Sequence, residues 1–287
     1  RVLCSEAYRT ALKQQLAAGA RSFAAARQAA VQALCPGADI AALLDKPNNN
    51  LAVEYCKAII EQNVEMQPIA LPRQGADHGQ ALTESSHTAF ASASALRALW
   101  AEGGAAALAP YVPEKALKLY KQAEYDGKYT DFAVMGHCEL ALLRAACTEQ
   151  APFAAVRGVS EGLEHRLENA VRETASLPAL LDALTTVRYP RARMRRLAMD
   201  AALGYTAQTP ALPPYLHLLG ARKETLPLPG ETALPLSHSL ARLARENETC
   251  AQMAAAQSRA SDLGALCRAK PEPMGGIYRQ KIIFLTN

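Results

Sequence analysis

Helix-forming segments follow one another from residue 101 to residue 267 with almost no strand pattern between them, which limits the fold more than any other feature. Aromatic residues make up only 6% of the chain, and alanine and leucine are abundant, a composition that favours helix over sheet. Prolines such as Pro110 and Pro113 separate the segments. We expect helices at residues 114–124, 131–147, 161–173, 177–186, 190–203, 236–246 and 250–267.

The first hundred residues follow a different pattern. Two alanine-rich helices in residues 5–34 and a helix from about Leu51 to Gln62 precede an alternating apolar segment, residues 64–71, that predicts a strand. A polar segment, residues 74–88, leads into another helix. This order indicates the closing half of an α/β unit, whose partner strands lie elsewhere. We predict an α/β plus α fold with a domain boundary near residue 100.

Charge, hydropathy and cysteine usage narrow the class of protein. No stretch approaches the roughly 18 apolar residues that a membrane span needs, and the N-terminus lacks the pattern of a secretory signal. The seven cysteines are odd in number and include no Cys-x-x-Cys pair. We therefore expect reduced thiols in a cytoplasmic protein, without a metal site, a membrane contact or a protein partner.

Three consecutive asparagines stand in the segment LDKPNNNLAVEYCKAI, residues 43–58. Asn49 or Asn50 is expected to cap the helix that begins near Leu51. Pro47 stiffens the approach and presents Asn48 from a rigid turn. An amide carries both a donor and an acceptor, which suits contact with a base edge or a ribose hydroxyl at the edge of an α/β unit.

The segment ASASALR, residues 91–97, indicates an anion site at the start of a helix. One of Ser92 and Ser94 is expected to cap the helix. The other serine, the free N–H groups of the first turn and Arg97 can converge on a polyphosphate. Arg73, at the end of the predicted strand, faces the same edge.

A second basic feature is the segment VRYPRARMRR, residues 187–196, which contains five arginines and no acid. Met194, Leu197, Ala198 and Ala201 are predicted to form the buried stripe of this helix. Exposed helices usually mix glutamate with arginine, so the acid-free run favours a phosphate backbone as partner. Carboxylates of the preceding helix, such as Glu161 and Glu164, are the alternative. The candidate RNA-binding residues are Arg188, Arg191, Arg193, Arg195 and Arg196.

Five segments together resemble one enzyme family. LDKPNNNLAVEYCKAI, FASASALRALW, EGLEHRL, TTVRYPRARMRRL and PPYLHLLGARKE occur in the order and at the spacing found in bacterial tRNA(Met) cytidine acetate ligases, members of the nucleotidylyltransferase superfamily. The resemblance implies that residues 1–100 are the C-terminal part of a Rossmann-like, ATP-binding nucleotidylyltransferase domain. It implies that residues 101–287 are a helical tRNA-binding domain.

The resemblance also implies a reaction. ATP, with Mg²⁺ on its phosphates, activates acetate as acetyl-adenylate, and the acetyl group passes to N4 of the wobble cytidine of elongator tRNA(Met). Asn48, Arg73, Ser92, Ser94 and Arg97 correspond to ATP-binding positions of the family, and the arginines of residues 188–196 to its basic helix.

One family feature is absent from these 287 residues. The family carries a His-x-Gly-His motif, and none of the six histidines here has that spacing. We therefore expect no catalytic residue in this chain and no activity from it alone. Two alternatives stay open at this point: a non-catalytic RNA-binding helical protein, and an adenylyltransferase that acts on a small phosphorylated acceptor.

Overall fold

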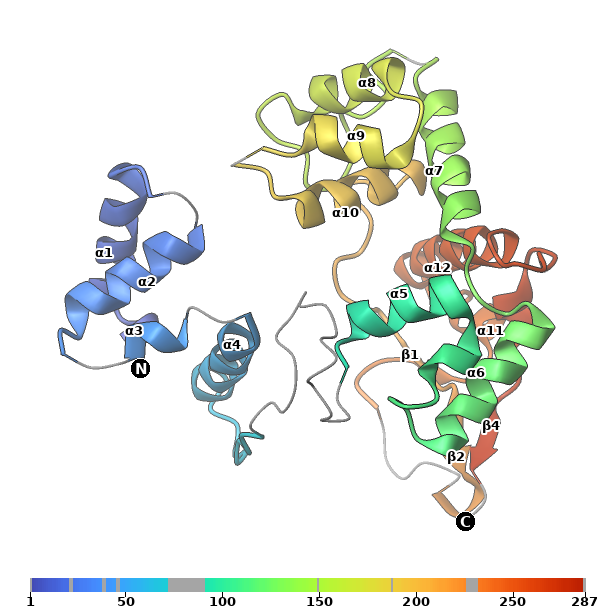
Figure 1. Cartoon of the computed structure of the whole chain (residues 1–287). Helices are drawn as coiled ribbons and strands as arrows, with labels where there is room; N and C mark the ends of the chain where they lie inside the picture. Colours follow the sequence, from blue (N-terminus) through green and yellow to red (C-terminus); the bar gives the residue numbers. More distant parts are fainter. Residues whose placement is uncertain are drawn as a thin grey trace. The chain divides into compact units, whose positions relative to one another are not determined.

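The computed structural model describes residues 2–20, 23–37, 40–44, 47–71, 91–148, 150–186, 188–225 and 232–285 (Figure 1). Contacts between residues divide the chain into two compact units, Arg1–Gln74 and Gly75–Asn287. Helix α5 (Ala93–Gly103) therefore groups with the second unit. The functional division near residue 100, into a nucleotide-binding and a tRNA-binding domain, stays a prediction.

The first unit is a small group of helices. The two predicted alanine-rich helices are confirmed as α1 and α2, and the Ser5 hydroxyl caps α1 by accepting from the Tyr8 N–H at 3.2 Å. Arg27 on α2 pairs with Glu54 on α4 at 2.5 Å. The core of the unit consists of Tyr8, Ala30, Val31, Ala41 and Leu44. The helices of this unit are η1 (Val2–Cys4), α1 (Glu6–Ala17), α2 (Phe23–Leu34), α3 (Ile40–Leu43) and α4 (Pro47–Glu61).

The strand predicted at residues 64–71 is wrong for the described part of the chain. These residues are exposed and pair with no described strand. Ile69 and Leu71 are 81% and 86% exposed. The alternating pattern is present, but a strand also needs a neighbour for its N–H and C=O groups, and no described segment supplies one.

The second unit begins with helices that lie close to their predicted positions. Trp100 anchors α5 by packing edge-on against Tyr120 of α6, with ring centroids 5.3 Å apart. Asp131 caps α7 by accepting from the N–H groups of Ala133 and Val134. These elements are η2 (Ala105–Leu108), α6 (Glu114–Asp126), α7 (Phe132–Ala146), α8 (Leu163–Glu173), α9 (Leu177–Leu184) and α10 (Arg191–Ala202).

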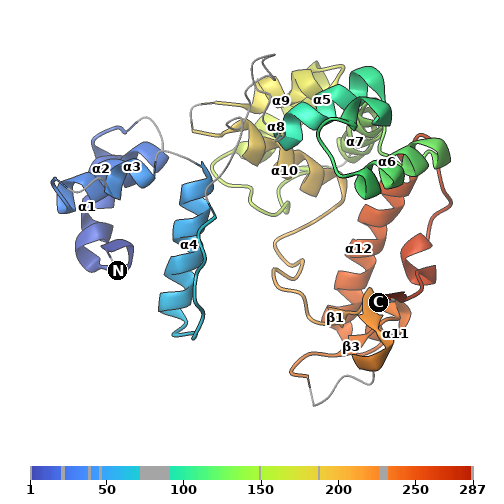
Figure 2. The ribbon, with the colours of Figure 1, turned by 60° about the horizontal axis from the view of Figure 1, so that its bottom comes forward.

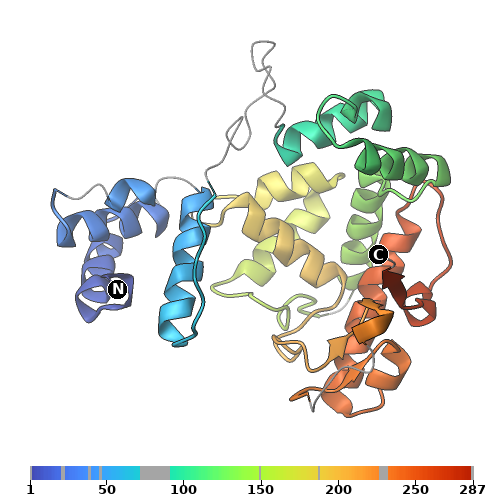
Figure 3. The same ribbon diagram turned by 90° about the horizontal axis from the view of Figure 1, so that it is seen from below.

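The main core of the second unit lies among α7, α8, α9 and α10, which Figures 2 and 3 show grouped together. The predicted stripe of α10 is confirmed, because all four of its residues are buried. Leu143, Leu167, Leu180 and Leu184 are fully buried. The cluster comprises Leu140, Leu143, Phe153, Val156, Leu163, Leu167, Ala170, Val171, Leu180, Leu181, Leu184, Tyr189, Met194, Leu197, Ala198 and Ala201.

The C-terminal part of the unit contains short parallel strand pairs. Strand β1 pairs with β3, and β2 pairs with β4. A helix predicted at residues 236–246 is shorter, because Leu236 and Ser237 form β3. The elements are β1 (Leu216–His217), β2 (Gly220–Arg222), η3 (Lys223–Thr225), β3 (Leu236–Ser237), α11 (Leu240–Leu243), α12 (Glu248–Leu266), η4 (Gly276–Arg279) and β4 (Ile283–Leu285).

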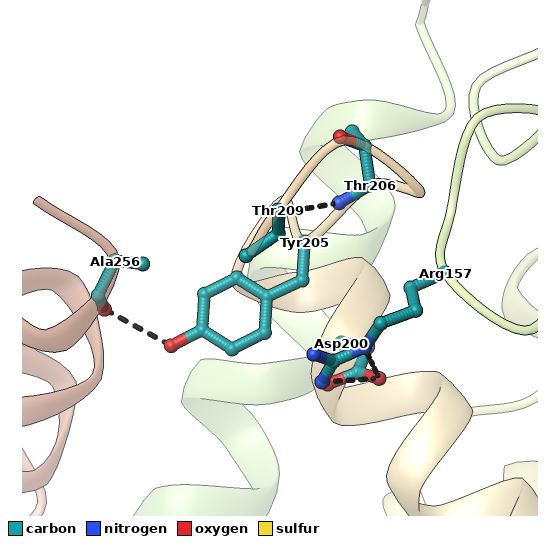
Figure 4. Close-up of polar contacts among 6 residues, drawn as sticks. All are labelled: Arg157, Asp200, Tyr205, Thr206, Thr209 and Ala256. Atoms are coloured by element: carbon teal, nitrogen blue, oxygen red, sulfur yellow. Dashed lines mark hydrogen bonds and ion pairs between the residues drawn. The ribbon is translucent and has the colours of Figure 1, made fainter. Parts of the chain in front are cut away.

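Polar contacts fasten the end of α10 to the C-terminal helix (Figure 4). The Tyr205 hydroxyl donates to the Ala256 carbonyl of α12 at 3.0 Å. Arg157 pairs with Asp200 at 2.9 Å, and its guanidinium lies 5.4 Å from the centre of the Tyr205 ring. These contacts link three segments that are distant in sequence. They stabilise the second unit in addition to its apolar core.

The predicted class, α/β plus α, is confirmed. Helices dominate the described residues, and the strand pairs among them are parallel. Among the described residues, no helix combines the length and the apolar character needed to cross a membrane.

Candidate functional site

The three asparagines lie inside helix α4 rather than before it. The helix begins at Pro47, so the prediction of a cap at Asn49 or Asn50 for a helix starting near Leu51 is wrong. Proline suits the first helical position because its fixed φ and missing N–H cost nothing there. Asn50 instead donates from Nδ2 to the Leu44 carbonyl at 2.7 Å, which ties α4 to the turn after α3. Asn48 is exposed on the first turn.

The serines at the start of α5 divide as predicted. Ser92 is the N-cap, accepting from the Ala95 N–H at 3.2 Å, and its side chain is buried. The hydroxyls of Ser92 and Ser94 lie 3.0 Å apart. Ser94 and Arg97 are exposed one turn apart, so both can reach a ligand at this helix end. Arg73 lies outside the described residues.

Among the described residues, two of the five arginines of the basic segment are paired with carboxylates. Arg188 forms an ion pair with Glu161, and Arg191 forms one with Asp182 of α9. The acid-free sequence of this segment therefore does not leave all of its arginines to phosphate, because carboxylates of other segments already pair with Arg188 and Arg191. Glu161, one of the two alternative partners considered from sequence, is the observed partner of Arg188.

Tyr189 organises the beginning of the basic segment. Its ring is buried, and its hydroxyl donates to Glu161 at 3.1 Å. The guanidinium groups of Arg188 and Arg193 lie 5.8 and 5.0 Å from the ring centre. Arg193 also donates to the Gly158 carbonyl at 3.4 Å. These contacts hold two cations in fixed positions, which lowers the entropy lost when they bind a ligand.

A cavity of about 700 Å³ brings together residues that the sequence assigned to two different ligands. Arg97 of α5, predicted for ATP, lines it together with Arg191 and Arg195 of α10, predicted for tRNA. None of its described lining residues is acidic. The remaining lining residues are Phe132, Ala133, Met135, Gly136, His137, Leu140, Ser176, Leu177, Pro178 and Leu181.

Arg195 and Arg196 are the most available cations of the segment. Both are exposed, and neither forms an ion pair with a described carboxylate. Arg195 also lines the cavity, whereas Arg196 does not. An anion at this surface therefore meets two guanidinium groups that need not leave an existing partner.

A buried carboxyl group lies on α7 among the cavity-lining positions of that helix. Glu139 is 1% exposed, and neither of its oxygens has a hydrogen-bond partner among the described residues. Burial raises the pKa of Glu139 to about 7, and the positive charge of Arg195 opposes the increase. Sequence reasoning missed this group, because an isolated glutamate on a helix is ordinarily solvated.

His137, on the same helix, has a defined orientation. Its Nδ1 lies 2.9 Å from the Ala133 carbonyl, and because a carbonyl only accepts, Nδ1 carries the proton. In the neutral ring Nε2 is then an acceptor. His137 is exposed and lines the cavity, so it adds a hydrogen-bonding position to a largely apolar wall.

The family profile described as HIGH Nucleotidyl Transferase matches residues 2–274. A tRNA(Met) cytidine acetate ligase from Listeria monocytogenes serovar 1/2a is 31% identical over 186 residues, which cover 63% of this chain and 45% of the relative. One from Geobacillus sp. (strain WCH70) is 29% identical over 204 residues, covering 65% and 49%. The chain thus spans about half the length of the curated relatives it matches.

Two solved structures show the same fold. TmcAL from Thermotoga maritima bound with alpha-thio ATP superposes with a TM-score of 0.79 at 20% identity, covering 98% of this chain and 71% of that one. The apo form gives 0.80 at 21% identity with the same coverage. The resemblance seen in the five sequence segments is confirmed. Because the family profile extends over nearly the whole chain, this chain belongs to the HIGH nucleotidyl transferase family.

Proposed function

We propose that the protein is an ATP-dependent ligase that acetylates a cytidine of tRNA(Met) in the cytoplasm. An acetate oxygen attacks the α-phosphorus of ATP and pyrophosphate leaves, which gives acetyl-adenylate. The N4 amine of the cytidine then attacks the acetyl carbon, AMP leaves and the amine loses a proton. The relatives' names and the fold of an ATP-analogue-bound neighbour support this proposal.

The observation that carries the proposal is the cavity shared by Arg97, Arg191 and Arg195. An acyl transfer from an adenylate to RNA needs the nucleotide and the RNA at one place. The cavity joins a residue proposed for the ATP phosphates to residues proposed for the RNA backbone. Asn48, Arg73, Ser92 and Ser94 complete the proposed ATP-binding set, with Mg²⁺ accompanying the phosphates.

The basic segment is proposed to bind the tRNA backbone. Each phosphate contact releases counterions, so affinity falls with salt, and each lost contact reduces the log–log slope by about 0.7 to 0.9. Replacing Arg195 and Arg196 by alanine should therefore flatten the slope by about 1.5. Replacing Arg188, which pairs with Glu161 and does not line the cavity, is the control and should change it less.

Fluorescence anisotropy of labelled tRNA across a salt series gives these slopes. Phosphate contacts carry no base information, so the loss should be similar for tRNA(Met) and for other tRNAs. An unchanged slope in the Arg195→Ala, Arg196→Ala variant would assign these arginines an ordinary solvated role and remove the RNA surface from the proposal.

The ATP half of the proposal has its own test in the full-length protein. Arg97→Ala should reduce isotope exchange between pyrophosphate and ATP by at least about tenfold, a typical loss for one charged contact to a phosphate. Affinity for tRNA should change much less. Asn48→Ala should weaken ATP binding and leave tRNA binding unaltered. Exchange at the normal rate in the Arg97 variant would show that Arg97 does not contact the phosphates.

A small phosphorylated acceptor is the second candidate, because three arginines over an apolar cavity also suit a mononucleotide-sized ligand. Competition separates the two. If the cavity binds a small phosphorylated acceptor, that compound should displace tRNA at concentrations near its own dissociation constant. If the protein is the ligase, tRNA should stay bound at these concentrations.

A further inference from the structure

The chemistry of the cavity wall differs from that of a simple phosphate surface. A site that only tracks a nucleic-acid backbone needs cations and polar groups. Here Phe132, Met135, Leu177 and Pro178 form much of the wall, and the arginines line only part of it. A ligand that fits must therefore have an apolar, flat or compact body joined to an anionic group.

We propose that the cavity holds one unpaired nucleotide of the RNA, with its base against Phe132 and its phosphate at Arg191 and Arg195. This inference rests on the proposed function, because it names how the RNA occupies the same site. A base turned out of its strand exposes a π-face and keeps its phosphate at one edge. The distribution of apolar and cationic side chains in the cavity matches that ligand.

Size and exposure support a nucleotide. At about 700 Å³ the cavity lies within the roughly 300–1,000 Å³ of sites that bind small ligands. Phe132 is 68% exposed at the first position of α7, so an aromatic ring is available without any rearrangement of the core. Stacking on such a ring is worth about 1–3 kcal/mol per base and tolerates every base.

The charge of the cavity favours an anionic occupant. Three guanidinium groups line the cavity and no described lining residue opposes them with a carboxylate. Arg191 is held from outside by Asp182, which fixes its position beside the cavity. His137 and Ser176 add polar atoms to the wall, and Nε2 of His137 is left for a polar atom of a base because Nδ1 meets the Ala133 carbonyl.

The test uses the 287-residue chain and a labelled hairpin RNA with the anticodon stem and loop of tRNA(Met). Each loop nucleotide is replaced in turn by an abasic residue, which keeps every phosphate. Fluorescence anisotropy should find one position at which the abasic change weakens binding by about 5- to 150-fold. Abasic changes at the other positions should have little effect.

Variants of Phe132 identify the side chain that meets this base. Phe132→Ala should weaken binding of the intact hairpin by a similar factor and show no further loss with the abasic hairpin, because both changes remove one interaction. Phe132→Tyr should retain affinity. Tyr125→Ala is the control, since Tyr125 is an exposed aromatic residue outside the cavity. Circular dichroism of each variant verifies the fold.

The outcomes separate this inference from the proposed function. If the hairpin binds with steep salt dependence and no abasic position matters, or if Phe132→Ala and the abasic change add independently, the nucleotide pocket is overturned and backbone binding stands. If the intact hairpin does not bind at all, the RNA-binding part of the proposed function fails with it. A loss of hairpin affinity in Tyr125→Ala as large as that in Phe132→Ala would also overturn the nucleotide pocket.

Discussion

The two compact units use their apolar residues in different ways. Among the described residues, the core of the first unit has five members, two of them alanine, whereas the main core of the second has sixteen. Phe23 and Tyr55 of the first unit are 60% and 62% exposed. Stabilisation follows the apolar area that is buried and not the apolar content of the sequence. Substitutions in the core of the second unit are therefore expected to have the larger effect on stability.

The largest loss of stability is expected for a substitution in the core of the second unit. Leu143 is fully buried in the second unit, so Leu143→Ala should lower the free energy of unfolding by about 2–5 kcal/mol. Val31→Ala, in the core of the first unit, removes two methyl groups and should cost about 1–2 kcal/mol. The single tryptophan, Trp100, lies in the second unit and reports on its unfolding by denaturant.

The Trp100 signal should respond differently to the two variants. An equal shift would mean that the two units unfold as one cooperative body. We expect Val31→Ala to leave the Trp100 transition nearly unchanged and to alter only the circular dichroism contributed by the first unit.

The second unit also buries a carboxyl group, that of Glu139. Its pKa in the folded state, about 7, lies above the ordinary value of 4.5, so the protonated form is the one that the fold favours. The stabilisation is complete below about pH 4.5 and is lost as the pH rises through 7. The difference amounts to about 3 kcal/mol between pH 4.5 and pH 8.

Glu139→Gln removes this titration and keeps the shape of the side chain. The natural protein should lose stability between about pH 4.5 and pH 7 and the variant should not, so the variant gains over this range and keeps a constant advantage above it. Urea denaturation from pH 5 to pH 8, followed by Trp100 fluorescence, measures it. Parallel pH profiles for the two proteins would contradict the assignment of a proton-binding group at this site.

A smaller loss of stability is expected in the first unit, at the hydrogen bond that joins the start of α4 to the preceding turn. Asn50→Ala removes the donor to the Leu44 carbonyl and should destabilise the start of α4 by about 1 kcal/mol. Asn48→Ala, on the same turn, is the control and should have little effect on stability. Hydrogen exchange of the α4 amides distinguishes them, and equal protection in both variants would rule out a structural role for Asn50.

The smallest effect is expected on the surface of the second unit. Arg188 and Glu161 are 69% and 54% exposed, so Arg188→Ala should change the free energy of unfolding by less than about 1 kcal/mol. Tyr189→Phe should cost more, because it leaves a buried ring without the hydroxyl that donates to Glu161. Thermal unfolding compares the two, and a larger loss in Arg188→Ala would mean that the ion pair is a major stabilising contact.

Most helices could be predicted from the sequence, but the residues of the site could be predicted only as separate groups. The four residues of the α10 stripe and a serine cap of α5 follow from helical periodicity and from the needs of a helix end. The start of α4 was missed because Pro47 can equally precede a helix or begin one. The proposed ATP and tRNA residues were found separately, and nothing in their spacing placed Arg97 beside Arg195.

The sequence by itself determined the helical periods, the buried face of α10 and the family resemblance, because each depends on residues a few positions apart or on ordered motifs. Only the tertiary structure decided which acids reach Arg188 and Arg191, and that Glu139 is buried. It also decided that residues 64–71 find no described strand partner. Ion pairs, burial and strand pairing all join segments remote in the chain, so packing, and not local pattern, determines them.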